Sequence, residues 1–248
     1  MNRHAFLIWR SAGVSDTGKV RSINQDAYLD LPEIGLWVVA DGMGGHEAGE
    51  VASRAIVEHL QHLSEPQDLN SYITDVQKCI QGVNKNLREI AAQKYNNAVV
   101  GSTVVVLIAY GRQYACLWAG DSRLYRLRNK KLEQISKDHN MLETYIAECA
   151  MNPKRAFDSK RAEALTRAVG GEDQLEIDLQ IDQMCKDDIF LLCSDGLYRE
   201  VPPEKISQLL SQKDDCTTMT KNLLQNALTG SAKDNITVAV VQISEVYG

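Results

Sequence analysis

Two strand-like runs joined by a very short link constrain the fold of this 248-residue chain more than any other feature. Residues 102–109 and 113–119 are rich in β-branched or aromatic side chains, and the turn between them contains Gly111-Arg112. A second pair of short runs follows within residues 124–135. Links of this length join antiparallel neighbours, because a parallel crossover needs a dozen or more residues. The chain therefore predicts antiparallel sheets.

Segments with helical periodicity lie between the strand-like runs. Apolar side chains recur every three or four residues over 51–63 and, more regularly, over 73–90. This spacing is typical of a helix with one apolar face. Further helices are predicted near 203–210 and 216–228, and strands at 189–193 and 236–243. Because apolar helix faces need a sheet to cover, we predict an α+β fold, with a central antiparallel β-sandwich flanked by helices in α-β-β-α layers.

The strand signal disappears between residues 136 and 169. This stretch is polar and partly helical, and we expect it to be an insertion on the rim of the sandwich. No Pro-, Gly- or Ser-rich linker divides the chain. Residues 1–248 are therefore expected to form a single domain.

Charge and composition exclude several classes of function. The formal net charge of -6 argues against nucleic-acid binding, which needs Lys and Arg to neutralise phosphates. The longest apolar run, 103–110, is far shorter than the roughly 20 residues of a membrane helix, and the run at 5–9 is too short for a signal peptide. The six cysteines form no CxxC pair and have no zinc-ligand spacing with His. We therefore expect a cytoplasmic protein with reduced thiols, no membrane insertion and, by default, a monomeric state.

Aspartates recur where the strand-like runs begin or end. Asp41, Asp121 and Asp195 each follow an apolar run and precede a small residue, while Asp26 and Asp234 come shortly before such runs. A single Asp-Gly pair is common in turns, but five acids at strand ends suggest a shared site. Oxygen-rich clusters suit hard cations such as Mg²⁺ or Mn²⁺. Two such cations can activate a bridging water and clamp a phosphoryl group.

Two further patterns bear on phosphate chemistry. Arg21 lies five residues before Asp26, and a guanidinium can hold two phosphate oxygens, although a solvated surface arginine is the alternative. Cys193 and Arg199 have the Cys-x5-Arg spacing of cysteine-dependent phosphatases. The intervening loop contains Asp195, however, and a loop that binds an anion should not carry a negative charge. Cys193 is better explained as the buried end of a strand.

Taken in order, these residues resemble the metal-dependent protein phosphatases of the type 2C class. The similarity extends from Gly13 to Val241, and the form Asp-Gly-Met-Gly-Gly-His is similar to that of the bacterial single-domain branch. The motifs that carry the resemblance are Arg21–Asp26, Val39–His46, Gly120–Arg123, Leu165–Gly170, Leu192–Leu197 and Asp234–Val238.

The resemblance implies a β-sandwich with two Mn²⁺ or Mg²⁺ ions at one end. The ligands of these two ions would be Asp41, the carbonyl of Gly42, Asp195 and Asp234. Asp26 would contact the metal-bound water, and Asp121 would join Asp195 in holding a third, weaker ion. Arg21 would bind the substrate phosphate. The insertion at 136–169 would be a flap beside the site.

The proton donor to the leaving group is less clear from the same resemblance. The eukaryotic members have Asp-Gly-His where this chain has Asp41-Gly42-Met43, and methionine cannot donate a proton. His46 is one candidate, but it could equally brace the following helix. A water on the third ion is another candidate.

The resemblance implies a protein serine/threonine phosphatase that works by in-line attack of a water bridging two divalent cations. Its substrates would be phosphorylated proteins, expected to be targets of a partner Ser/Thr kinase. Two alternatives belong to other classes. One is a catalytically weak phosphoprotein-binding module on the same fold, and the other is a metal-dependent nuclease or phosphohydrolase of another substrate.

Overall fold

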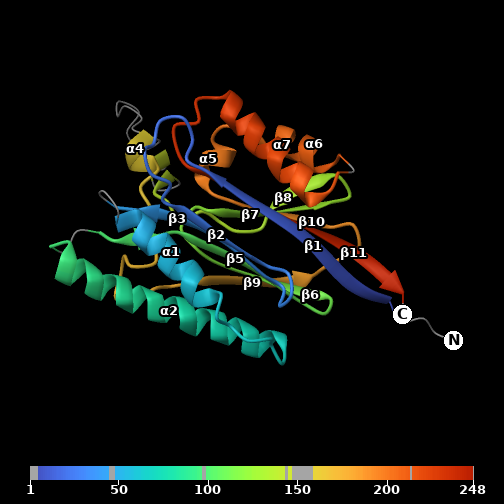
Figure 1. The fold of residues 1–248 in the computed structure, drawn as a ribbon, viewed down its shortest axis with the longest axis horizontal. Helices are drawn as coiled ribbons and strands as arrows, with labels where there is room; N and C mark the ends of the chain where they lie inside the picture. The colour runs from blue at the N-terminus through green and yellow to red at the C-terminus, as the bar shows by residue number, and fades with distance from the viewer. Residues whose placement is uncertain are drawn as a thin grey trace.

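The computed structural model describes residues 5–44, 48–96, 99–142, 145–146, 159–212 and 214–247. Within these ranges the strands form two antiparallel sheets packed face to face (Figure 1). The first sheet has the order β1 (Ala5–Asp16), β11 (Ile236–Tyr247), β10 (Ile189–Cys193), β7 (Arg123–Arg128) and β8 (Lys131–Gln134). The second has the order β2 (Asp26–Leu31), β3 (Leu36–Met43), β5 (Val104–Tyr110), β6 (Gln113–Ala119) and β9 (Asp178–Gln183), and β4 (Gly101–Ser102) pairs with β3.

Helices cover the outer face of each sheet. Helices α1 (Ala48–Leu60) and α2 (Leu69–Lys94) bury their apolar faces against the second sheet. Helices α6 (Pro203–Leu210) and α7 (Cys216–Thr229) do the same for the first sheet. The predicted α+β fold with α-β-β-α layers is therefore confirmed. None of the helices in the described ranges is long and apolar enough to cross a membrane.

The central strands are apolar on both faces because each face meets a different core. In β3, Leu36 and Val38 point toward α1 and α2, whereas Trp37 and Val39 point into the space between the sheets. Successive side chains of a strand alternate between faces, so a continuous apolar run is what a strand buried on both sides requires. This explains why the runs before the predicted aspartates were continuous rather than alternating.

The short links behave as the sequence predicts. Residues 110 and 113 are paired across the turn between β5 and β6, where Gly111 has a positive φ of 58°. Asn129 and Lys130 both have positive φ, 52° and 63°, in the turn between β7 and β8. Two-residue turns with positive φ match the right-handed twist of the flanking strands.

The sequence analysis underestimated three strands. It noted only residues 5–9 of β1 and only a short run at β2, and it did not predict β9. Strand β9 lies at the edge of its sheet, and its apolar residues Leu179 and Ile181 are exposed. Part of the predicted insertion at 136–169 falls outside the described residues. Its described parts include α4 (Ser159–Ala162) and a bridge between Asn140 and Leu165.

Candidate metal and phosphate site

Strand pairing brings the predicted aspartates to one end of the sandwich. Asp26 at the start of β2 pairs with Asp41 near the end of β3. Asp195 begins the short helix α5 (Asp195–Tyr198) directly after β10, and Asp234 lies just before β11. Asp121 lies in the turn between β6 and β7. This end is on the side of α4 and α5 in Figure 1, opposite the paired Ala5 and Tyr247.

A pocket of about 240 Å³ opens at this end. Six of the predicted site residues line it, and Asp26 is not among the described residues of its lining. The lining residues predicted from sequence are Arg21, Asp41, Gly42, Asp121, Asp195 and Asp234. Glu163, Leu165 and Arg199 also line the pocket and were not predicted as site residues. His46 lies outside the described residues.

Asp26 lies behind the pocket wall. Its side chain is buried, and its Oδ2 accepts a hydrogen bond from Ser194 Oγ at 2.7 Å. Its Oδ1 is buried without a partner among the described residues. Burial, together with the charges of Asp195 and Asp234, raises the pKa of Asp26 to about 7.

The negative charges of three pocket-lining carboxylates, Asp41, Asp121 and Asp195, also have few positive partners. Burial raises the pKa of Asp41 well above its ordinary value, and the charges of Asp26 and Asp195 add to the shift. Burial and then Asp195 raise the pKa of Asp121 to about 7. The pKa of Asp195 is raised by burial, although Arg199 opposes the shift. These groups resist ionising together, which is the electrostatic situation that a bound divalent cation relieves.

The donor set fits a hard cation. Asp195 Oδ1, like Asp26 Oδ1, is buried without a partner in the described part of the chain, and carboxylate oxygens are the preferred ligands of Mg²⁺ and Mn²⁺. Among the described residues, no three acidic, His or Cys side chains already converge in a coordination geometry. Arg21 and Arg199 pair with Asp234 and Asp195, respectively, each at 2.9 Å, so two of the acids are oriented by arginines.

The glycines after Asp41 and Asp195 are required by close backbone packing. A Cβ on Gly42 would collide with the carbonyl oxygen of Gly49, and a Cβ on Gly196 would collide with that of Asn235. The repeated Asp-Gly pattern therefore reflects two places where neighbouring segments pack tightly behind the acids. Neither glycine has a positive φ, so close approach rather than turn geometry explains them.

Asn235 holds the loop that carries Arg21. Its Nδ2 donates to the carbonyl oxygens of Thr17 and Ile23, at 2.9 and 3.1 Å, and its Oδ1 accepts from the Gln25 amide at 2.8 Å. The Arg21 side chain is about half exposed at the pocket rim, and Asp234 raises its pKa through a hydrogen bond and its charge. The sequence analysis did not single out Asn235, although it directly follows Asp234.

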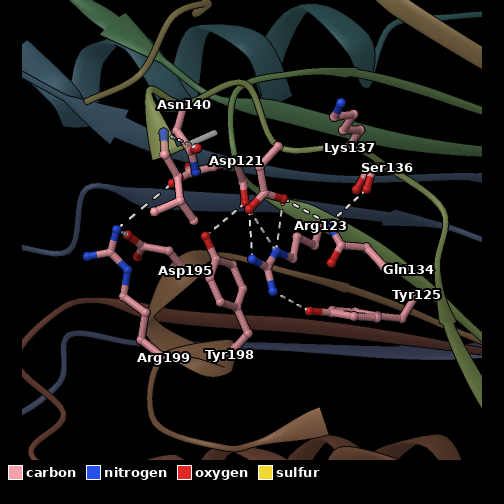
Figure 2. Close-up of polar contacts among 12 residues, drawn as sticks. Asp121, Arg123, Tyr125, Gln134, Ser136, Lys137, Asn140, Asp195, Tyr198 and Arg199 are labelled. Atoms are coloured by element: carbon pink, nitrogen blue, oxygen red, sulfur yellow. Dashed lines mark hydrogen bonds and ion pairs between the residues drawn. The ribbon is translucent and has the colours of Figure 1, made fainter. Parts of the chain in front are cut away.

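Aromatic and arginine side chains brace the Asp121 turn (Figure 2). Tyr198 donates a hydrogen bond from its hydroxyl to the Asp121 carbonyl oxygen at 3.1 Å. The Arg123 guanidinium lies 3.5 Å from the centre of the Tyr198 ring and holds Asp138 through hydrogen bonds of 2.7 to 3.2 Å. A cation over an aromatic face with a bidentate carboxylate is a rigid arrangement.

Cys193 does not belong to this chemistry. Its side chain is fully buried, and burial raises the pKa of its thiol. The rejection of a cysteine nucleophile is therefore supported by the structure. Arg199, the other member of that pattern, does line the pocket, where it pairs with Asp195 rather than with a cysteine-bound phosphate.

The site therefore combines a buried carboxylate cluster with an arginine at its rim, on two sheets covered by helices. The sequence of residues 18–237 matches the protein phosphatase 2C family. The chain is 31% identical to the serine/threonine protein phosphatase PstP of Mycobacterium tuberculosis over 98% of its own length, but it spans only 46% of that protein. It is 30% identical to the serine/threonine phosphatase stp of Listeria innocua, covering 92% of this chain and 93% of that one.

Solved structures show the same relationship. PppA, described as a key regulatory component of T6SS in Pseudomonas aeruginosa, has 41% sequence identity and a TM-score of 0.86, covering 97% of this chain and 100% of that one. The catalytic domain of PstP in complex with two manganese ions has 31% identity and a TM-score of 0.83, covering 96% and 99%. The chain belongs to the protein phosphatase 2C family.

Proposed function

We propose that this protein is a metal-dependent phosphatase that hydrolyses phosphoserine and phosphothreonine in proteins. The observation that carries the proposal is the set of buried, undercompensated aspartates lining one pocket, with Arg21 at its rim. The relatives named above as serine/threonine phosphatases, one of them described with two manganese ions, support the same activity.

Asp41, the Gly42 carbonyl, Asp195 and Asp234 would hold two Mn²⁺ or Mg²⁺ ions. When bound, two such cations lower the pKa of a water and neutralise charge on a phosphoryl group in an in-line displacement. The partnerless Oδ1 of Asp195 supports its role as a ligand. Asp26, behind the pocket wall, would accept a proton or a hydrogen bond from the attacking water.

Arg21 would bind the phosphate of the substrate. Its guanidinium has five donors, and among the residues that the structure describes it donates one hydrogen bond, to Asp234. The exposed position at the rim suits a group that meets a phosphorylated side chain entering from solvent. A phosphate and two neighbouring cations would compensate each other's charge, which the arginine alone cannot do.

The same proposal includes the setting of the enzyme. Its substrates would be phosphorylated proteins, among them targets of a partner Ser/Thr kinase, and it would act in the cytoplasm as a monomer. Residues 136–169 would form a flap beside the pocket in a single catalytic domain. Glu163 and Leu165, which line the pocket, support this placement for the part that the structure describes.

The direct test is turnover of a phosphothreonine peptide in Mn²⁺, with and without excess EDTA. We expect activity that requires the metal and falls by orders of magnitude in Asp195→Asn. Asp75→Asn, an exposed position on α2, is the matched control and should retain full activity. Full activity in EDTA or in Asp195→Asn would refute the proposal.

Two competing functions are separated by substrate. A phosphoprotein-binding module would bind the peptide without releasing phosphate. A nuclease or nucleotide phosphohydrolase would prefer an oligonucleotide or a nucleotide over the peptide. Parallel assays of the three substrates at equal concentration therefore distinguish the functions.

A further inference from the structure

One guanidinium group lies among three carboxylates at the edge of the pocket. Arg199 Nη2 is 2.9 Å from Asp195 Oδ2 and 3.9 Å from Asp121 Oδ2. Its Nη1 is 3.1 Å from Glu163 Oε2. Figure 2 shows Tyr198, at the end of α5, and Arg199, directly after it, pointing toward Asp121 and Asp195.

The backbone fixes Arg199 in this position. The Arg199 amide donates to the Asp195 carbonyl oxygen at 3.0 Å, so the two side chains are one helical turn apart. On either side, Leu197 is buried in the core under α6 and α7, and Tyr198 is held by the Asp121 carbonyl oxygen. The side chain of Arg199 is 39% exposed, so its charge lies at the edge of the pocket rather than within the core.

The two oxygens of Asp195 have different partners. Arg199 binds Oδ2, whereas Oδ1 is buried and has no partner among the described residues. A cation of the proposed core pair that bound Oδ1 would therefore not compete with Arg199 for the same oxygen atom. The Oδ2 atoms of Asp195 and Asp121 both face the guanidinium, so Arg199 lies on the side where these two carboxylates would meet a further cation.

The positive charge of Arg199 compensates the negative charges of Asp195 and Asp121, as a further cation would. Its guanidinium lies 2.9 Å from Asp195 Oδ2 and 3.9 Å from Asp121 Oδ2, so its positive charge offsets part of the negative charge of both carboxylates. Two cations within about 4 Å repel each other strongly in a partly buried site. An arginine and a divalent ion at this edge should therefore exclude each other.

We propose that Arg199 is a positioning residue that serves as a built-in cation between Asp121 and Asp195, in place of a third divalent ion, and ties Glu163 to the site. The inference rests on the proposed two-metal function. It explains why a Cys-x5-Arg pattern occurs in this chain without a reactive cysteine. The arginine belongs to the carboxylates, and the cysteine only ends the preceding strand.

The test is the number of Mn²⁺ ions bound at equilibrium by the wild-type protein, Arg199→Gln and Arg199→Lys, measured by calorimetry and by metal content after dialysis. We expect two ions in the wild type and in Arg199→Lys. Arg199→Gln should bind a third ion, at least about tenfold more tightly than any third ion in the wild type. Equal stoichiometry and affinity in wild type and Arg199→Gln would overturn the inference.

Arg54→Gln is the matched control. Arg54 also pairs with an acid one turn away, Glu50 at 2.7 Å, but on the exposed surface of α1. The Arg54→Gln variant should bind the same number of Mn²⁺ ions as the wild type. Thermal unfolding of each variant would verify that it is folded. A wild-type protein that binds no Mn²⁺ would instead refute the proposed function, so the two failures are distinguishable.

A second readout separates a structural role from an electrostatic one. Glu163→Gln removes one contact of Arg199 but leaves its charge beside Asp195 and Asp121. It should keep the wild-type stoichiometry of Mn²⁺. A third ion in Glu163→Gln, or in Arg199→Lys, would mean that side-chain packing rather than the positive charge excludes it, and would contradict the inference.

Discussion

Two buried aspartates in the first sheet have opposite surroundings. Asp188, just before β10, is fully buried, and its carboxylate receives hydrogen bonds from Arg128 at 2.6 and 2.7 Å and from the Cys185 amide at 2.7 Å. Asp195, just after the same strand, is also buried but keeps one oxygen without a partner in the described residues. The two aspartates are seven positions apart in sequence, on either side of the five-residue strand β10. The carboxylate before the strand has hydrogen-bond partners for both oxygens, whereas the carboxylate after it does not.

This difference is more informative than burial itself. A buried carboxylate that is paired and hydrogen-bonded contributes to the native structure, and its loss leaves a partner unpaired. A buried carboxylate oxygen without a hydrogen-bond partner lowers the stability of the metal-free fold. The presence of such a carboxylate must therefore be explained by a role other than stability. The proposed function supplies that explanation, because a divalent cation would take up the unpartnered carboxylate oxygens.

The largest expected effect comes from Asp195→Asn. It should reduce kcat for a phosphothreonine peptide by at least about a thousandfold, because an amide oxygen binds and compensates a divalent cation much less well than a carboxylate. Metal-free stability should be unchanged or higher, since the change removes an unfavourable buried charge. Steady-state kinetics and urea unfolding in EDTA measure the two effects, and a large loss of stability would break the contrast with Asp188.

Asp188→Asn should give the reverse pattern. The change leaves Arg128 with a neutral partner, and we expect a loss of about 2–4 kcal/mol in the free energy of unfolding. The pocket is at the other end of β10, so kcat should stay within about twofold of the wild type where the protein is folded. Urea titration and peptide turnover at 15 °C test both statements, and a stable but inactive variant would contradict them.

The metal-free protein should lose stability as the pH rises. The pKa values of Asp26 and Asp121 are raised to about 7 in the fold, against about 3.9 in an unfolded chain. The folded state therefore binds more protons at these two groups between these values, so their contribution to stability is greatest near and below pH 4 and falls by a few kcal/mol toward pH 7. Urea unfolding in EDTA across this range measures the slope.

Saturating Mn²⁺ should reverse that trend, because a bound cation favours the ionised carboxylates. The stabilisation by metal should be larger at pH 7 than at pH 5. Equal stabilisation at both values would mean that protons and metal do not compete for the same acids, and would break the link between undercompensated charge and function. Asp75→Asn, on the exposed face of α2, should show the wild-type profile.

Much of the fold and the five acids could be predicted from local patterns. Continuous apolar runs ending in Asp-Gly marked Asp41 and Asp195, because strands buried on both faces are apolar throughout and stop where the chain reaches solvent. Strand β9 was missed because its apolar side chains are exposed, so pairing with β6 rather than burial places it in the sheet. Pairing partners are not encoded in a local pattern.

Residues that act across the chain were also missed. Asn235 stabilises a loop more than 200 residues away in sequence, and Arg199 acts on Asp121, which lies before β7. Arg199 was noted only for its spacing from Cys193, and Asn235 only as part of the motif Asp234–Val238, so neither was linked to the segment that it contacts. Their roles depend on which segments the sandwich brings together, and only the folded chain provides that information.

Arg21 offers the smallest effect on stability and a specific effect on catalysis. Its ion pair with Asp234 is exposed, so Arg21→Ala should change the free energy of unfolding by less than about 1 kcal/mol. Loss of its guanidinium should raise KM for the phosphopeptide by about tenfold, because the phosphate loses a charged donor. Arg21→Lys should recover part of this loss but not all, since a lysine cannot hold two phosphate oxygens in a planar fork. If KM were unchanged and stability fell instead, Arg21 would belong with Arg128 as a structural partner of an aspartate, and the pocket would need another group to bind the phosphate.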